Sequence, residues 1–232
     1  MARCSGVLFY LLDGYLLRRK GSITMFRISK IIYTFLGAVA ICGAFLFAQP
    51  AHAMEPREFY TLARNYPGIN AFAATVQSAV ETGHWKSYLW INAYNGAGIK
   101  APASWRSAGK PYIKVLSPES VSGKYIMCES YFRFYSSPEE FLRDYREKII
   151  QDYPRSAASA DNMWGYFAGL YHGRLGSWAT DHRYFEKLAK KAVQLEAVLL
   201  PPGHLKRAFE YAKNHKCLEQ WQVKIIEAVI MK

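Results

Sequence analysis

The stretch that most constrains the fold is residues 73–85, AATVQSAVETGHW. Together with the residues before it, it has apolar side chains at spacings of three or four, which is typical of a helix with one face in a core. These positions are Ile69, Phe72, Val76 and Val80. Gly83 is expected to end the helix, so the Glu81 carboxylate lies at the helix terminus.

Glu81 is a candidate catalytic residue because of its surroundings. It lies just off the apolar stripe, on a side with small or polar residues that would leave room for a cleft: Ala74, Gln77 and Ser78. Trp85 offers a flat apolar surface nearby. A carboxyl group held beside an aromatic ring keeps its proton near neutral pH, as a general acid must. A solvated glutamate near a helix end is the alternative on this stretch alone.

The first 53 residues read as a leader. From Met25 the chain has a basic start, an apolar run at 31–47 and the small-x-small pattern Ala51-His52-Ala53, which together predict a signal peptide (25–53) cleaved after Ala53. An uncleaved membrane anchor is the alternative, although the run is short for a span of about 20 residues. An upstream start codon chosen in error would explain residues 1–24.

The charge and the cysteines of residues 54–232 bear on the partners and the redox compartment of this part of the chain. Of 30 Lys and Arg and 18 Asp and Glu, residues 54–232 keep 24 and 17, a net charge of +7. This basic balance suits an anionic partner such as nucleic acid, a membrane surface or the bacterial wall. Cys128 and Cys217 remain after cleavage, and they either pair in an oxidising compartment or stay as free thiols.

One β-hairpin is expected in a chain that is otherwise helical. Residues 112–116 and 124–135 favour strands, and 120–123 have turn chemistry. Alternation in the second strand predicts one face with Ile126, Cys128, Phe132 and Phe134, and another with Tyr125, Glu129, Tyr131, Arg133 and Tyr135. Two carboxylates lie in this hairpin: Glu119 near the turn and Glu129 in the second strand.

Helices account for the remaining segments. They are expected at 56–65, 86–93, 138–152, 157–171 and 182–199, followed by two more after the break at 200–203. Ser137, Pro138 and Glu140 form a helix start with a capping box, and Thr180 or Asp181 is a natural cap for the long helix. The predicted class is α+β: a mainly helical domain at 54–199 with a small hairpin lobe, and a helical tail at 200–232.

Two carboxylates that face each other across a groove suit glycosidic bond cleavage. One protonates the leaving oxygen, and the other activates water or stabilises positive charge on the sugar ring. Glu81 at the helix end and a glutamate of the hairpin have this arrangement in the predicted domain.

A series of short motifs makes the interpretation specific. In order, these are Gln77-Ser78-Ala79-Val80-Glu81-Thr82-Gly83, Tyr94-Asn95, Gly98-Ile99-Lys100-Ala101, Trp105, Ser117-Pro118-Glu119, Gly123, Phe132-Arg133-Phe134-Tyr135-Ser136-Ser137-Pro138-Glu139 and Trp178-Ala179-Thr180-Asp181. Their order over residues 69–195 resembles the bacterial glucosaminidase family of peptidoglycan hydrolases, glycoside hydrolase family 73.

The resemblance implies a lysozyme-like fold and hydrolysis of the glycan strand of peptidoglycan, typically on the reducing side of N-acetylglucosamine. It also implies catalytic roles for two residues. The general acid is Glu81. The family's second glutamate lies four residues before a turn glycine and thirteen before the Phe-Arg motif, which selects Glu119 through Gly123 and Phe132. Glu129 fits neither spacing and is expected to be a solvent-side strand residue.

The sequence departs from the family pattern at several positions. Trp178 stands where the family usually has a Tyr before Ala-Thr-Asp, and His182 replaces a Pro. Gly96-Ala97 replaces a common Leu-Phe, and Thr82-Gly83-His84-Trp85 stands where the family has Ser-Gly-Trp after the acid. Trp178 can stack and donate one hydrogen bond, but it lacks a hydroxyl group.

Several residues are candidates for substrate binding. Trp85, Trp105 and Trp178 are candidate sugar platforms, with a core role as the alternative for each. Asn95 comes from the Tyr-Asn motif, and Lys100 is suited to a wall carboxylate or to a structural role. The expected partner is peptidoglycan rather than nucleic acid, and neither a metal nor an organic cofactor is implied.

The expected protein is therefore a periplasmic or secreted endo-β-N-acetylglucosaminidase. Three other functions stay open: a glycan-binding scaffold with little turnover, a membrane-anchored interaction module whose C-terminal helices bind an envelope protein, and a lytic transglycosylase or muramidase. Analysis of the fragments released from peptidoglycan separates them.

Overall fold

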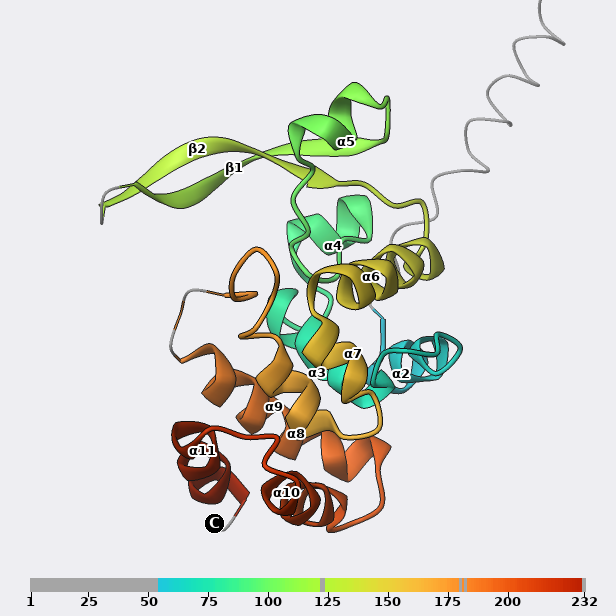
Figure 1. Ribbon diagram of the computed structural model, residues 1–232. Helices are drawn as coiled ribbons and strands as arrows, with labels where there is room; N and C mark the ends of the chain where they lie inside the picture. The colour runs from blue at the N-terminus through green and yellow to red at the C-terminus, as the bar shows by residue number, and fades with distance from the viewer. Residues whose placement is uncertain (1–53, 122–123, 180, 182, 231–232) are drawn as a thin grey trace, which may run out of the picture. The chain divides into compact units, whose positions relative to one another are not determined.

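The computed structural model describes residues 54–121, 124–179, 181 and 183–230, and it contains helices with a single two-stranded sheet in that part of the chain (Figure 1). The predicted leader, with its cleavage site, lies outside the described residues, as do Gly123, Thr180 and His182. The elements are α2 (Pro56–Ala63), α3 (Ala71–Glu81), α4 (Tyr88–Ala93), α5 (Ala103–Ser107), β1 (Tyr112–Val121), β2 (Lys124–Arg133), α6 (Pro138–Asp152), α7 (Pro154–Ala158), α8 (Met163–Gly169), α9 (Tyr184–Leu199), α10 (His204–Asn214) and α11 (Gln220–Ile230). The predicted α+β class is confirmed.

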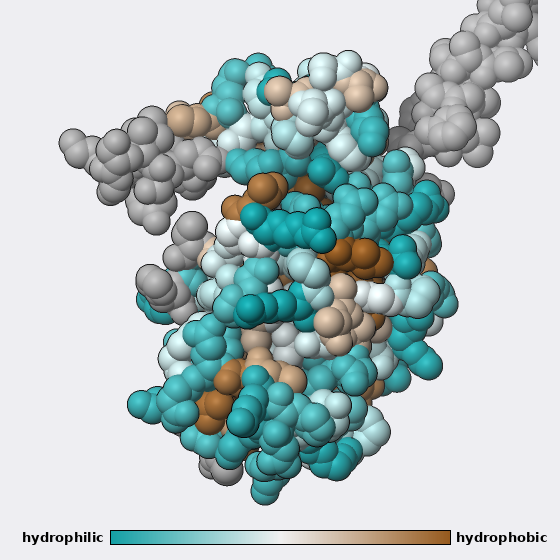
Figure 2. Space-filling model, viewed as in Figure 1, coloured by the Kyte–Doolittle hydropathy of each residue, from teal (hydrophilic) through white to brown (hydrophobic). Residues whose placement is uncertain are grey.

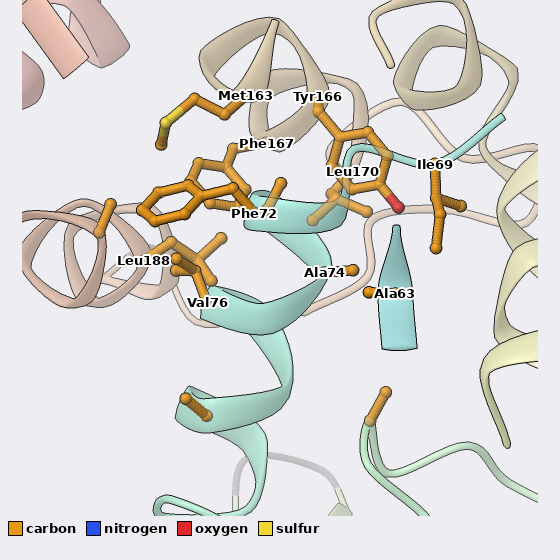
Figure 3. Close-up of a cluster of buried hydrophobic side chains, with 14 of the residues drawn as sticks. Ala63, Ile69, Phe72, Ala74, Val76, Met163, Tyr166, Phe167, Leu170 and Leu188 are labelled. Atoms are coloured by element: carbon orange, nitrogen blue, oxygen red, sulfur yellow. The ribbon is translucent and has the colours of Figure 1, made fainter. Parts of the chain in front are cut away.

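Helix α3 is the central element of the core. It begins at Asn70, whose side chain accepts a hydrogen bond from the Ala73 N–H, and it packs against α2, α8 and α9. Figure 3 shows Phe72 and Val76 of α3 against Met163 and Phe167 of α8 and Leu188 of α9. Most of its side chains are buried, as a helix enclosed by other helices requires.

This burial corrects one expectation. The side of α3 with Ala74, Gln77 and Ser78 was expected to line a cleft, but all three residues are buried. The space next to them is filled, because Trp85 donates a hydrogen bond to Ser78 Oγ and Tyr145 of α6 donates one to Gln77 Oε1. The open space lies instead beyond the C-terminal end of α3.

Helix α6 follows the prediction closely. Ser137 caps it by accepting from the Glu140 N–H, and the Glu140 carboxylate accepts from the Ser136 N–H, one residue earlier than in a standard capping box. The predicted inward stripe is buried: Phe141, Leu142, Tyr145 and Ile149. The expected helix 157–171 is instead two short helices, α7 and α8, because the chain turns between Ser159 and Asn162.

The C-terminal tail belongs to the same core. Helix α10 packs against α8 and α9, and α11 packs against α9. Four of the tail's apolar side chains are fully buried in the main cluster: Leu205, Phe209, Ala212 and Ile226. Residues 200–230 are thus continuous in packing with the preceding helices.

The hairpin confirms most of the predicted alternation. On β2, Ser130 and Phe132 are buried, whereas Met127 and Glu129 on the opposite face are exposed. The strand ends at Arg133, two residues earlier than expected, and the alternation ends with it. Phe134 is therefore exposed and Tyr135 buried, the reverse of the prediction, and the Tyr135 hydroxyl donates to Asp144 of α6.

Asn95 joins the hairpin to the helices. Its Nδ2 donates to the backbone oxygens of Ile99 and Arg133, each at 2.9 Å, and its Oδ1 accepts from the Ile99 N–H at 2.9 Å. Backbone hydrogen bonds from Ala101 N–H to Tyr131 O and from Arg133 N–H to Ile99 O extend the same junction. The loop at 95–101 is consequently held along the last residues of β2.

One face of the molecule is mostly hydrophilic, and both cysteines in the described part of the chain are free. Figure 2 shows a mostly hydrophilic face with small, separate hydrophobic patches. Cys128 and Cys217 form no disulfide with each other. Every helix in the described part of the chain is too short or too polar to cross a membrane.

Asn95→Ala is expected to destabilise the protein strongly, because it leaves the buried Ile99 N–H without its acceptor and removes a donor from the Ile99 and Arg133 carbonyl groups. With about 1–3 kcal/mol for each unpaired buried group, urea unfolding should report a loss of at least about 2 kcal/mol. Asn92→Ala is the matched control: Asn92 is exposed and bonds only to the Tyr88 carbonyl. Equal losses for the two variants would contradict this role of Asn95.

Candidate active site

Glu81 is the last residue of α3, and a compact turn fixes the chain after it. Thr82 Oγ1 donates to the Ser78 carbonyl and accepts from the Trp85 N–H, and both residues are buried. Gly83 has a φ of 56°, a left-handed conformation that glycine adopts without strain. The predicted end of the helix is confirmed, and the turn holds the Glu81 backbone in one position.

Two side chains from far along the sequence donate hydrogen bonds to the same oxygen of Glu81. The indole N–H of Trp178 lies 3.1 Å from Oε1, and the hydroxyl of Tyr184, the first residue of α9, lies 2.7 Å from it. The other oxygen, Oε2, faces Gly98: a Cβ atom on Gly98 would lie 3.9 Å from it. Since Oε1 accepts two donors, Oε2 is the oxygen that can carry a proton.

Burial raises the pKa of Glu81, because the charged form is costly away from water. The hydrogen bonds from Tyr184 and Trp178 and the charge of Lys187 act in the opposite direction, but they do not cancel the effect of burial. The side chain therefore keeps its proton to a higher pH than an ordinary glutamate. A general acid requires this property.

A layer of buried tyrosines and one glutamine lies behind Glu81. Tyr145 donates to Gln77 Oε1 at 2.6 Å, and its oxygen lies 2.9 Å from that of Tyr166. Burial raises the pKa of Tyr145, Tyr166 and Tyr184, so all three hydroxyls stay protonated. Tyr184 is consequently a constant donor to Glu81 across the working pH range of most enzymes.

A surface cavity of about 360 Å³ lies next to Glu81. Two of its lining residues, Gly98 and Trp178, are the ones that approach the Glu81 carboxyl group. Other lining residues that bear on binding are Lys100, Tyr153 and Leu175. Leu175 is 92% exposed, so this apolar side chain is available to a ligand in the cavity.

Lys100 lies at the rim of this cavity, between the loop and the hairpin. Its ammonium group donates to Ser130 Oγ at 2.8 Å and lies 4.3 Å from the centre of the Phe132 ring. Lys148 and Asp152, which also line the cavity, form an ion pair at 2.7 Å. The cavity therefore combines charged side chains, which can bind a polar ligand, with an aromatic wall.

Trp178 forms part of that wall. Its ring packs against Tyr145 at 6.0 Å and Tyr153 at 5.2 Å between ring centres. Its single N–H donates to Glu81, so the residue that stands in place of the family's usual Tyr forms a hydrogen bond with the carboxyl group. Trp178 is only partly buried and is available to a sugar.

Trp85 and Asn95 lie away from solvent, which corrects their expected role in substrate binding. Trp85 is 1% exposed, packs on Phe59 and donates to Ser78. It has no open face for a sugar. Asn95 is also 1% exposed, and its amide is occupied by the loop and β2. Both residues support the site from the core.

Trp105 of α5 lies away from the Glu81 cavity. Its N–H donates to the Pro111 carbonyl, and Arg133 and Lys110 lie over its ring at 4.1 Å and 4.4 Å. Arg133 is in turn paired with Asp144 of α6 at 2.7 Å. Arg133 thus connects the hairpin to α6, and Trp105 is not among the residues that line the Glu81 cavity.

The two hairpin glutamates differ in position. Glu129 forms an ion pair with Lys114 at 2.9 Å, and its side chain is 55% exposed. The prediction of a solvent-side strand residue is confirmed for Glu129. Glu119 lies on β1 opposite Ile126 in the strand register, and its side chain lies outside the described part of the structure.

The sequence reasoning missed Tyr184, Tyr153 and Leu175. Tyr184 begins the long helix three residues after Asp181, whose carboxylate accepts from the Arg183 N–H. Tyr184 lies in the first turn of the helix that follows the Trp178-Ala179-Thr180-Asp181 motif, and this position could have marked it as a site residue. Nothing local marks Tyr153 or Leu175, because they reach the cavity only through the packing of α6, α7 and the loop before α9. The described residues contain no cluster of His, Cys, Asp or Glu suited to a metal ion.

Comparison with known families identifies the chain. Residues 57–196 match the model of the glucosaminidase family, described as mannosyl-glycoprotein endo-beta-N-acetylglucosaminidase. The chain belongs to the glucosaminidase family. It is accordingly a glycoside hydrolase.

Several solved structures are similar to this glucosaminidase-family chain, whereas no curated protein matches it. The C-terminally truncated glycoside hydrolase domain of FlgJ from Salmonella typhimurium is 27% identical with a TM-score of 0.47, over 62% of this chain and 99% of that one. A peptidoglycan hydrolase mutant from Sphingomonas sp. A1 is 25% identical with a TM-score of 0.47, over 67% and 94%. The catalytic domain of the autolysin Auto from Listeria monocytogenes is 19% identical with a TM-score of 0.46, over 74% and 96%.

The raised pKa of Glu81 predicts a pH-dependent effect of Glu81→Gln on stability. The folded chain holds the Glu81 proton more tightly than the unfolded chain, so this stabilisation is complete below the unfolded pKa and is lost as pH rises through the raised pKa. Glutamine does not titrate. Relative to the wild type, the variant should therefore gain stability in urea unfolding as the pH rises above the unfolded pKa of about 4.3. A difference in unfolding free energy between Glu81→Gln and the wild type that does not change with pH would contradict the raised pKa.

Proposed function

We propose that this chain is an exported endo-β-N-acetylglucosaminidase that cleaves the glycan strand of bacterial peptidoglycan. The observation that carries the proposal is the buried Glu81 carboxyl group, with a raised pKa and one free oxygen beside a surface cavity. Membership of the glucosaminidase family supports it, and so do the peptidoglycan hydrolases among the similar structures. The basic charge of residues 54–232 suits the anionic wall polymer.

In the proposed reaction, Glu81 donates its Oε2 proton to the glycosidic oxygen as the bond to the anomeric carbon breaks. The resulting carboxylate is stabilised where it forms, because Tyr184 and Trp178 already donate to Oε1. Their combined effect keeps burial from making the acid too weak to release its proton. Trp178 has a second role as a wall for the sugar ring.

Glu119 is the proposed second carboxylate. It either accepts a proton from the attacking water or stabilises an intermediate formed by the substrate's own N-acetyl group. Its position on β1 near the hairpin turn supports the assignment, since the hairpin extends from the part of the chain that is joined to Lys100 and the cavity rim. Lys100 and Leu175 are the proposed contacts of the substrate at that rim.

The proposed location is the periplasm or the cell exterior, after cleavage behind Ala53. This follows from the signal-like leader and from a substrate that lies outside the cytoplasmic membrane. The proposed partners are glycan strands, with the C-terminal helices α10 and α11 as a candidate surface for an envelope protein.

Residues 54–232 incubated with purified peptidoglycan should release fragments that end in reducing N-acetylglucosamine, as read by mass spectrometry. Glu81→Gln should lower the rate by at least about 100-fold, because the proton donor is removed. Anhydro-muramic ends would instead identify a transglycosylase. The absence of fragments would favour a glycan-binding protein, and normal cleavage by Glu81→Gln would refute the assignment of the acid.

Glu119→Gln and Glu129→Gln form a matched pair on the hairpin. Loss of the Glu119 carboxylate should reduce turnover of peptidoglycan by about 100-fold or more, whereas loss of Glu129 should remove only an exposed ion pair with Lys114 and leave turnover unchanged. The reverse order of effects would transfer the second catalytic role to Glu129.

A further inference from the structure

Gln77 lies four residues before Glu81 on α3, so the two side chains leave the helix on the same side. The residue is 0% exposed, and the proposed reaction gives it no role. A glutamine that is shielded from water has to satisfy its oxygen and its amino group inside the protein. The neighbours of these two groups therefore determine what Gln77 does.

Tyr145 of α6 sets the orientation of the Gln77 amide. Its hydroxyl donates to Oε1 at 2.6 Å, and this bond uses its only proton. In the 2.9 Å contact between the hydroxyls of Tyr145 and Tyr166, Tyr166 of α8 is consequently the donor. Both tyrosines thus donate in one direction, toward Gln77.

The amino group of Gln77 acts on Tyr184. Its Nε2 is buried and has no hydrogen bond of standard geometry in the described part of the chain. Burial raises the pKa of Tyr184, and the Gln77 side chain acts to lower it, as a donor to the hydroxyl oxygen does. The Tyr184 proton itself goes to Glu81 Oε1 at 2.7 Å. The result is a donor series, in which each member donates to the next: Tyr166, Tyr145, Gln77, Tyr184 and Glu81.

The reverse direction would weaken the support of the acid. If the Gln77 amide were rotated by half a turn, its Oε1 would compete with Glu81 for the Tyr184 proton. Tyr145 would then accept from Nε2 and donate to Tyr166. The Tyr166 proton would have no acceptor, because its hydroxyl bonds only to Tyr145 in the described part of the chain. A buried donor without an acceptor is costly, so the observed direction is the stable one.

We propose that Gln77 and Tyr145 are positioning residues for the general acid: they fix the direction of the donor series, so that its last donor always points to Glu81 Oε1 and the acidic proton stays on Oε2. The role of Glu81 as the acid rests on the proposed function, whereas the direction of the series is a property of the folded core. A hydrogen bond to a carboxylate is stronger than one to a neutral acceptor, so a donor fixed in advance favours the ionised form that proton transfer leaves behind.

The other groups that act on the Glu81 carboxyl group do not belong to the donor series. Burial raises the pKa of Glu81, and besides Tyr184 the groups that lower it are the Trp178 N–H and the charge of Lys187 of α9. Lys187 is paired with Asp181 at 2.7 Å. Tyr145→Phe keeps the ring that packs against Trp178, so it removes a member of the series and leaves these groups in place.

NMR titration of the Glu81 carboxyl carbon in the isotope-labelled protein, assigned by its loss in Glu81→Gln, tests the proposal without any need for activity. Tyr145→Phe should raise the pKa of Glu81 by at least about 0.5, which corresponds to one weak hydrogen bond. Gln77→Met, which removes both polar groups of the amide, should raise it as well. Tyr171→Phe is the matched control: it removes a buried tyrosine hydroxyl outside the series and should leave the pKa unchanged.

A double variant distinguishes the donor series from a general loosening of the core. Because Tyr145 acts through Gln77, the double variant should titrate as Gln77→Met alone does. If circular dichroism shows that Gln77→Met does not fold, Tyr166→Phe provides the same test, since it should shift the wild type but not Tyr145→Phe. Three results would overturn the proposal: an unchanged pKa in Tyr145→Phe, an equal change in Tyr171→Phe, or additive shifts in the double variant.

The pH dependence of kcat/KM on peptidoglycan separates this inference from the enzymatic proposal. In Tyr145→Phe, the alkaline limb of the profile should move to higher pH by the same amount as the titration of Glu81. If the wild type does not cleave peptidoglycan but the carboxyl titrations shift as expected, the enzymatic proposal fails and the role of the donor series remains. If the wild type cleaves and the titrations do not shift, the donor series is refuted and the enzymatic proposal remains.

Discussion

The pair of hydrogen bonds to Glu81 Oε1 is the interaction on which the site depends. A carboxyl group this buried binds its proton tightly, and without donors its charged form would be very costly. Trp178 and Tyr184 lower that cost on one oxygen and leave the other free. Burial and donation together give a group that holds its proton to a higher pH than an ordinary glutamate and can still release it.

The core of the protein is built to hold these donors in place. Tyr184 starts a helix whose inner face packs against α3, the helix that ends at Glu81. Trp178 is held between Tyr145 of α6 and Tyr153, and its loop follows α8. The hydrogen bonds of the Glu81 carboxyl group therefore depend on the packing of four helices: α3, α6, α8 and α9.

Sequence reasoning reached the class of fold, the end of α3 at Glu81 and the exposed position of Glu129, because periodicity and turn chemistry determine them locally. The sequence did not predict the position of side chains that depends on contacts between distant segments of the chain. Trp85 and Asn95 lie in motifs near Glu81 along the chain, but the turn after α3 directs Trp85 into the core and the Asn95 amide is occupied by the end of β2. Tyr184 was missed for the same reason, since only the contact of α9 with α3 brings it to the carboxyl group.

The sequence positions of the two donors to Glu81 also have a consequence for the folding of the enzyme. They lie 97 and 103 residues further along the chain than the carboxylate that they bond. Contacts of such sequence separation form only after a large loop has closed. A nascent or partly folded chain therefore contains an ordinary glutamate at position 81, and the polypeptide acquires its acid as one of the late results of folding.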